Sequence, residues 1–196
     1  ALGLPLDLVI ARKIGHPGNP EYAICAITES GQLVCNEQER AGVDPAWFAQ
    51  AETREREEAI RRRARYFGGR PSISAVGKVA ILVDDGIATG LTMLAAIREI
   101  RSQGPREIMV AIPVVPRETV ERLEAEGARV VALQVPEFFL GAVGMYYADF
   151  RPVTDEEVIQ LLRRDPVLFA FPEFSPMAAK LLELPQLSAG AWSAER

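Results

Sequence analysis

The second half of the chain alternates strand and helix patterns, and this alternation most constrains the fold. Residues 78–83 form an apolar run typical of a buried strand, and residues 91–103 place apolar side chains at helical spacing. Strand, helix and strand patterns follow at residues 107–115, 116–127 and 129–133. Parallel βαβ units with right-handed crossovers fit this order. We therefore expect an α/β fold with an open, mainly parallel twisted sheet and helices on both faces.

The first half of the chain predicts a different arrangement. Residues 6–13 are typical of a buried strand that ends in the cations Arg12 and Lys13, and the Gly- and Pro-rich residues 14–23 predict a loop. Residues 23–36 predict a β-hairpin that turns at Ser30 and Gly31. The fold class therefore includes a β-hairpin insertion.

A long helix is expected between the hairpin and the parallel sheet. Asp44 and Pro45 are a favourable N-cap and first-turn pair, and the helix should run to about Phe67. Residues 54–67 are rich in arginine and glutamate. This pattern favours a solvated helix with ion pairs along it, while RNA contact stays an alternative.

Composition limits the class of protein. The chain has 196 residues, 48% of them hydrophobic and 25% charged, which is typical of one globular domain with a tail. Its net charge of −5 argues against nucleic-acid or membrane-surface binding. No apolar run has the length of a membrane-spanning helix, so we expect a cytoplasmic protein. We assign residues 1–164 to the domain and residues 165–196 to a C-terminal extension.

Cys25 and Cys35 flank the predicted hairpin, which leaves pairing open. Without a secretory context, two cysteines are more simply reduced core residues, and this is our prediction. With two cysteines and the single histidine His16, a structural zinc site is not expected. His16 itself lies in the Gly- and Pro-rich loop, either near a substrate or, as we favour, on the surface.

The stretch "VAILVDDGIATGLTM", residues 79–93, carries the strongest chemical signal. Ligands of open α/β sheets lie beyond the carboxyl ends of the strands, where Asp84 and Asp85 are expected. The small-residue loop that follows opens a helix whose free N–H groups favour a phosphate, and Thr89 and Thr92 add hydroxyl donors. Two carboxylates would repel a phosphate unless they bind a diol or hold Mg²⁺ through water. The stretch therefore indicates a ribose 5-phosphate site.

Three other interpretations of this stretch are less favoured. A Walker B strand needs an upstream phosphate-binding loop, but Gly77-Lys78 is followed by Val79 and lacks the earlier glycine. A receiver-domain acid pair would lie nearer the start of the chain. An ordinary strand–turn–helix with surface acids explains neither the pairing of the acids nor the threonine-containing loop.

The residues "ILVDDGIATGLT" resemble the phosphoribosyl-pyrophosphate (PRPP) motif of type I phosphoribosyltransferases. The resemblance implies that Asp84 and Asp85 contact the ribose hydroxyls and that residues 86–90 hold the 5-phosphate. The implied phosphate-binding residues are Gly86, Ile87, Ala88, Thr89, Gly90 and Thr92. With "RKIGHPGNPEYAICAI" and "AVGMYYADFRPVTDEEV", the chain resembles bacterial predicted phosphoribosyltransferases of unassigned substrate over roughly residues 1–164.

The resemblance also implies a reaction. Mg²⁺, held mainly through substrate and water and near the two aspartates, would accompany PRPP, and Arg12 and Lys13 would approach the pyrophosphate. Asp85, Arg12 and Lys13 are the expected catalytic residues, with Asp85 as a proton acceptor. The family places an earlier strand and pyrophosphate loop before Leu6, so we expect an N-terminal truncation.

The acceptor is the less defined half of the predicted substrate pair. Residues 136–150 follow the last core strand and are rich in aromatic side chains, of which Phe139, Tyr146 and Tyr147 are candidates to stack on a base. Covering a sheet edge or a contact in a homodimer is the alternative role for these rings. The chain is therefore predicted to transfer phosphoribose from PRPP to a small acceptor, expected to be a nucleobase. The alternative is a regulatory module that senses PRPP or a nucleotide monophosphate without turnover.

Overall fold

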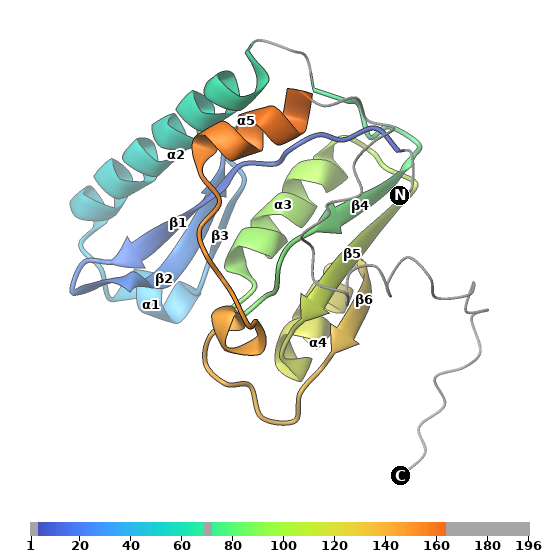
Figure 1. The fold of residues 1–196 in the computed structure, drawn as a ribbon. Helices are drawn as coiled ribbons and strands as arrows, with labels where there is room; N and C mark the ends of the chain where they lie inside the picture. The colour runs from blue at the N-terminus through green and yellow to red at the C-terminus, as the bar shows by residue number, and fades with distance from the viewer. Residues whose placement is uncertain (1–3, 69–71, 164–196) are drawn as a thin grey trace.

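The structure, a computed structural model, describes residues 4–68 and 72–163 and contains two three-stranded sheets (Figure 1). The first is antiparallel, in the order β1-β2-β3, and the second is parallel, in the order β4-β5-β6. The antiparallel strands are β1 (Ala11–His16), β2 (Asn19–Thr28) and β3 (Leu33–Cys35). The parallel strands are β4 (Val79–Val83), β5 (Glu107–Val114) and β6 (Arg129–Gln134).

The helices of the described residues connect and cover these sheets. They are α1 (Glu37–Ala41), α2 (Pro45–Phe67), α3 (Leu91–Ser102), α4 (Arg117–Ala125) and α5 (Asp155–Arg163), with the 3₁₀ helix η1 (Val143–Tyr146). In the order β4-β5-β6, crossovers of the usual right-handed kind place α3 and α4 on the same face of the parallel sheet. The bond of 2.7 Å from Arg98 Nη2 on α3 to Glu126 at the end of α4 agrees with this placement.

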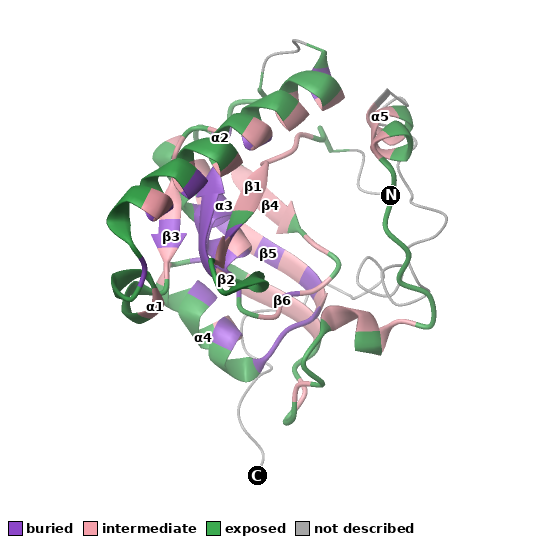
Figure 2. Ribbon diagram, turned by 90° about the vertical axis from the view of Figure 1, so that its left-hand side faces the viewer, coloured by how far each residue is buried: buried purple, intermediate pink, exposed green. Residues whose placement is uncertain are grey.

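Helix α3 joins the two sheets into one body. Its buried side chains, such as Leu94 and Ile97, share a core with Ala26 of β2 and with Val110 and Ile112 of β5. The other face of the antiparallel sheet packs Ile14 and other residues against α2, through Phe48 and Ala51. Figure 2 shows buried residues gathered on β2, α3 and β5. The antiparallel sheet therefore lies between α2 and α3.

The parallel sheet, its two crossover helices and α2 match the predicted pattern closely. Asp44 Oδ1 accepts a hydrogen bond of 2.8 Å from Trp47 N, and the helix it caps ends at Phe67. Thr154 and Glu157 form the reciprocal pair of hydrogen bonds typical of a capping box at the start of α5. The antiparallel pairing of β2 with β3 confirms the hairpin.

The prediction of a loop at residues 14–23 was wrong. Strand β1 continues to His16, and β2 begins at Asn19, so the two strands form a hairpin that turns at residues 17 and 18. Glycine is needed at position 15 because a Cβ there would lie 2.1 Å from the carbonyl oxygen of Pro20. The Gly and Pro residues therefore serve a tight, irregular hairpin. Strand β1 begins only at Ala11, and the short α1 was not predicted.

The prediction of two reduced cysteines was also wrong. Cys25 and Cys35 face each other in the register of β2 and β3, with Cα atoms 4.0 Å apart, and form a disulfide. Opposite positions on neighbouring strands direct both side chains to the same face, a juxtaposition that cysteine count alone does not reveal. Cys25 is fully buried, as expected for a core residue.

Candidate functional site

The two predicted acids follow β4 directly, at the carboxyl edge of the parallel sheet. Asp84 is half-buried and Asp85 more exposed, and Asp84 Oδ1 accepts a hydrogen bond of 3.0 Å from the N–H of Asp85. Burial, and secondarily the charge of Asp85, raises the pKa of Asp84 to about 6. Partial burial also raises the pKa of Asp85. The chain thus keeps two carboxylates partly out of water, where they are costly without a partner.

The side chains of Lys13 and Arg12 belong to opposite faces of the sheet, as those of neighbours on a strand do. The charge of Lys13 lowers the pKa of both Asp84 and Asp85, so this cation lies near the acid pair. Arg12 instead donates from Nε and Nη2 to Glu55 of α2, at 3.2 and 2.9 Å. The structure brings Lys13 to the predicted site and holds Arg12 on the α2 side of the sheet.

Residues 84–90, here called the acid loop, connect β4 to α3 and fit closely against their surroundings. The N–H of Ile87 donates to Val114 O at 2.9 Å, and its side chain is buried. A Cβ on Gly86 would lie 2.5 Å from Val143 Cγ1 and 2.9 Å from Val114 Cγ1, so only glycine fits there. Gly90 has a φ of +78° and begins α3.

Side chains from α4 hold the outer part of the acid loop. Thr119 Oγ1 donates to Ala88 O, and Arg122 Nη1 donates to Thr89 O, both at 2.9 Å. Sequence analysis missed both residues. A threonine and an arginine on a helix have no pattern that distinguishes them from ordinary helix residues, so no signal in the sequence pointed to this role.

Four N–H groups of the acid loop are available to a ligand. Within the described residues, no backbone or side-chain acceptor bonds the N–H of Gly86, Ala88, Thr89 or Gly90. The first N–H groups of α3 lie next in the chain, at the positive end of the helix dipole. Thr89 is exposed and Thr92 half-buried. This arrangement suits an anion such as a phosphate.

An aromatic segment follows β6 and packs onto the acid loop. Residues 136–150, here called the aromatic segment, include η1, and Tyr147 Oη donates to the backbone oxygen of Asp85. The rings of Phe139 and Tyr146 stack with centroids 5.5 Å apart, and Tyr147 packs on Phe150 at 5.1 Å. Of the three predicted acceptor residues, Tyr147 therefore lies directly beside the acids, while Phe139 and Tyr146 stack on each other.

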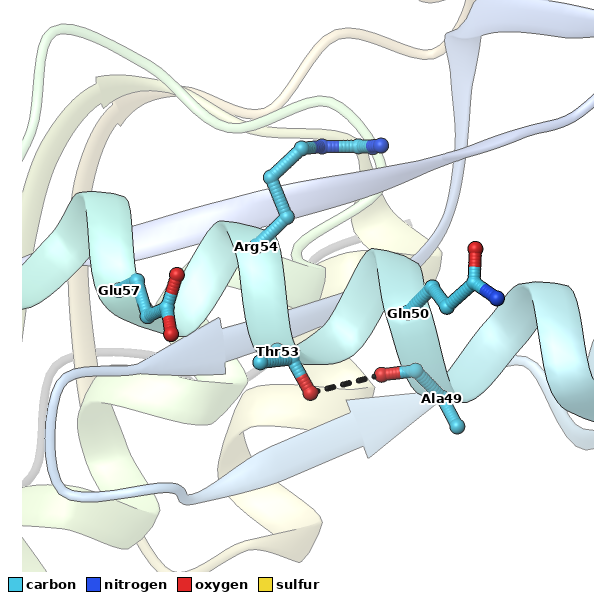
Figure 3. A pocket seen from close by; sticks show the side chains of 5 residues that line it. All are labelled: Ala49, Gln50, Thr53, Arg54 and Glu57. Atoms are coloured by element: carbon cyan, nitrogen blue, oxygen red, sulfur yellow. Dashed lines mark hydrogen bonds between the residues drawn. The ribbon is translucent and has the colours of Figure 1, made fainter.

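Two other features lie apart from this site. His16 ends β1, and its Nδ1 accepts a hydrogen bond of 3.0 Å from Gly18 N in the hairpin turn. Figure 3 shows an open depression on the exposed side of α2 that contains none of the predicted site residues. Its lining residues are Ala49, Gln50, Thr53, Arg54 and Glu57. No helix among the described residues is long and apolar enough to cross a membrane.

The donor set at the acid loop bears on the predicted Mg²⁺. Carboxylate oxygens, which Asp84 and Asp85 offer, are suitable ligands for this cation. Across residues 4–68 and 72–163, however, no group of three or more His, Cys, Asp or Glu side chains is placed to hold a metal ion. Asp84 and Asp85 therefore offer part of a ligand set that suits Mg²⁺.

The fold and the site together define a domain of the type I phosphoribosyltransferase class. Residues 1–149 match the family model of the phosphoribosyl transferase domain, and the chain belongs to this family. A protein named "Putative phosphoribosyl transferase", from two strains of Mycobacterium tuberculosis, is 38% identical over 166 residues. The match covers 84% of this chain but only 37% of that protein, so the chain spans little more than a third of these curated relatives.

A solved structure is similar as well. The crystal structure of TT1426 from Thermus thermophilus superposes with a TM-score of 0.65 at 45% sequence identity. The match covers 82% of this chain and 76% of that one. The predicted α/β class with a parallel sheet and helices, and the predicted family, are thereby confirmed.

Proposed function

We propose that the acid loop binds Mg²⁺–PRPP and that the domain transfers its phosphoribosyl group to a small acceptor, with a nucleobase as the expected class. One observation carries the proposal: the carboxylates of Asp84 and Asp85 are followed, before α3, by four N–H groups that no acceptor within the described residues bonds. A ribose 5-phosphate offers hydroxyl donors to the acids and an anion to the N–H groups. The chain spans little more than a third of the length of its curated relatives, so the activity of a whole protein of this kind is also part of the proposal.

The roles of the residues follow from their positions. Asp84 and Asp85 accept hydrogen bonds from the ribose hydroxyls, and residues 86–90 with Thr89 and Thr92 hold the 5-phosphate. Lys13, the cation near the acids, attracts the pyrophosphate. Arg12 can approach the pyrophosphate as well only if its guanidinium leaves Glu55. Bound Mg²⁺ supplies charge neutralisation for the pyrophosphate.

The transfer exchanges one bond at the ribose C1. The bond from C1 to the pyrophosphate oxygen breaks, and its electron pair leaves with pyrophosphate. The lone pair of an acceptor nitrogen forms the new C1–N bond through a transition state that resembles an oxocarbenium ion, as in glycoside chemistry. A proton released from that nitrogen passes to Asp85, whose raised pKa suits a proton acceptor.

The acceptor is proposed to lie against the aromatic segment. Tyr147 is the ring nearest the acids, because its hydroxyl donates to the Asp85 backbone. Phe139 and Tyr146 form a stacked pair in the same segment and add apolar surface. A flat, uncharged ring suits such surroundings. A homodimer, a nucleotide monophosphate as product and a cytoplasmic location complete the proposal, without nucleic acid or membrane as a partner.

Calorimetry tests the binding half. The double variant Asp84→Asn, Asp85→Asn should lose PRPP binding in the presence of Mg²⁺, whereas Glu57→Gln, an exposed acid on α2, should bind as the parent does. Unchanged binding by the double variant would sink the assignment. Release of pyrophosphate across a panel of bases then tests transfer. If PRPP binds but no base leads to release of pyrophosphate, the alternative is favoured, a regulatory module that senses PRPP without turnover.

A further inference from the structure

Three side chains from outside the acid loop bind three of its backbone carbonyls. Tyr147 Oη donates to Asp85 O, Thr119 Oγ1 to Ala88 O and Arg122 Nη1 to Thr89 O. Tyr147 comes from the aromatic segment, and the other two come from α4. These three residues are called the carbonyl clamp here.

Holding a carbonyl fixes the direction of the next N–H. The peptide unit is planar and trans, so its C=O and the N–H of the following residue point in opposite directions. The carbonyls of Asp85, Ala88 and Thr89 therefore orient the N–H groups of Gly86, Thr89 and Gly90. These are among the loop N–H groups that no acceptor within the described residues bonds.

The local packing leaves the clamped loop little freedom. Thr119 is only 1% exposed, and a Cβ added to Gly90 would lie 2.8 Å from Thr119 Cγ2. Gly86 is enclosed by Val114 and Val143, and Val143 belongs to the same aromatic segment as Tyr147. A loop rich in glycine has high conformational entropy when free, so contacts that restrict it before a ligand arrives lower the cost of binding.

We propose that Thr119, Arg122 and Tyr147 are positioning residues, which hold the carbonyls of the acid loop so that its N–H groups face the anion. This inference rests on the proposed function, because the anion is taken to be the 5-phosphate of the substrate. It adds residues that act through the loop rather than by touching the reacting atoms. Since Tyr147 also belongs to the aromatic segment, it further links the acceptor side to the ribose-phosphate side.

The test uses three substitutions that remove one donor each and keep most of the shape. They are Thr119→Val, Arg122→Gln and Tyr147→Phe. Each has a matched control with a similar bond far from the loop. Thr53→Val removes a donor to Ala49 O, Arg61→Gln an ion pair to Glu58 and Tyr22→Phe a bond to Glu39.

Two readouts are needed. Hydrogen exchange of residues 86–90 in the unliganded protein should be faster in each clamp variant and unchanged in the controls. Calorimetry with ribose 5-phosphate should show affinity lower by roughly threefold to tenfold in each clamp variant, the usual effect of one hydrogen bond. The loss at Arg122→Gln should persist at high salt, because a direct contact with phosphate would be screened. Thr119→Ser keeps the hydroxyl and should retain affinity.

The outcomes separate the two proposals. Unchanged exchange in the three clamp variants would overturn the clamp, whether or not ribose 5-phosphate binds. Faster exchange with unaltered affinity would show that the oriented N–H groups do not hold the anion, which also overturns it. Absence of ribose 5-phosphate and PRPP binding in the parent protein would reject the proposed function, while the exchange data would still decide whether the clamp orders the loop. Should Thr119→Val fail to fold, the Arg122 and Tyr147 variants decide.

Discussion

Arg12 on β1 is bound to Glu55 on α2, through two guanidinium nitrogens at 3.2 and 2.9 Å. The next residue, Lys13, belongs to the opposite face of the strand, and its charge lowers the pKa of Asp84 and Asp85. One step along a strand therefore separates a residue that ties the sheet to a helix from one that serves the site.

This separation predicts different effects for two substitutions. Lys13→Met should weaken PRPP binding with little change in stability, because it removes the exposed cation proposed to attract the pyrophosphate. Arg12→Met should lower the free energy of unfolding by about 1 kcal/mol, since it leaves Glu55 with the exposed Arg54 alone as its cationic partner. Calorimetry and thermal unfolding of both variants check the prediction. A larger loss of PRPP binding in Arg12→Met than in Lys13→Met would contradict it.

The raised pKa of Asp84 predicts a pH-dependent cost to stability. Since this pKa is about 6 in the folded chain and ordinarily 3.8, the folded state binds more protons than the unfolded state between these pH values. Stability should therefore fall as pH rises from about 4 to about 6. Asp84→Asn should be more stable than the parent at pH 7.5, by about 1–3 kcal/mol, with no difference near pH 3.

Thermal unfolding of parent and variant across this pH range measures the effect. Glu58→Gln is the control of opposite sign, because hydrogen bonds from Arg61 and Arg62 lower the pKa of Glu58 to about 2. That variant should be slightly less stable than the parent at neutral pH. An Asp84→Asn variant less stable than the parent at pH 7.5 would show that the ionised carboxylate has a stabilising partner.

The disulfide predicts sensitivity to reduction. Cys25 and Cys35 are 10 residues apart. Closing a loop of this size lowers the entropy of the unfolded chain and so stabilises the folded state by about 2–3 kcal/mol. Dithiothreitol should lower the Tm of the parent protein. The double variant Cys25→Ala, Cys35→Ala should unfold at a lower temperature and be indifferent to dithiothreitol. Two titratable thiols in the denatured, unreduced parent would contradict the pairing.

The close contact of Gly90 with Thr119 at the start of α3 predicts the effect of a substitution on stability and of a second substitution that relieves it. Gly90 and Gly104 have similar φ values, +78° and +72°, but only Gly90 has a close neighbour, since a Cβ added there would lie 2.8 Å from Thr119 Cγ2. Gly104→Ala should therefore cost backbone strain alone, about 1 kcal/mol. Gly90→Ala should cost about 1–3 kcal/mol more, because of the added overlap.

The rescue uses Thr119→Ser, which removes Cγ2 and keeps the hydroxyl. In the Gly90→Ala background it should restore most of the added loss, as measured by denaturant unfolding. The same change beside Gly104→Ala should restore nothing. Equal losses for the two alanine variants would indicate that the contact at Gly90 relaxes freely.

The parallel sheet could be predicted because its signals are local. The runs at β4, β5 and β6, the helical spacing in α3 and the cap at Asp44 each depend on residues close in sequence. The acid loop could be recognised for the same reason. The hairpin of β1 with β2 was missed because Gly15 and the following residues have the composition of a loop, and their pairing depends on contacts across the strands.

What escaped prediction at the site depends on contacts distant in sequence. Thr119 and Arg122 bind carbonyls 31 and 33 residues away, and Tyr147 binds one 62 residues away. Arg12 and Lys13 are adjacent, and only the tertiary packing shows which of them lies near the acids. The pairing of Cys25 with Cys35 likewise follows from strand register, which spacing alone did not decide.

The path of the chain after β6 has a mechanical consequence. Residues 135–154 span from the parallel sheet to α5, and α5 is fastened to α2 by Arg65 with Glu156 and by Tyr66 with Asp155, at 2.7 and 2.6 Å. The span is thus anchored at both ends, with Tyr147 in between. Because this span is held at both ends, the place of Tyr147 beside the acid loop depends on how α2 and β6 are positioned. Residues far from the acid loop, on α2 and α5, therefore take part in fixing where one of its three side-chain contacts is made.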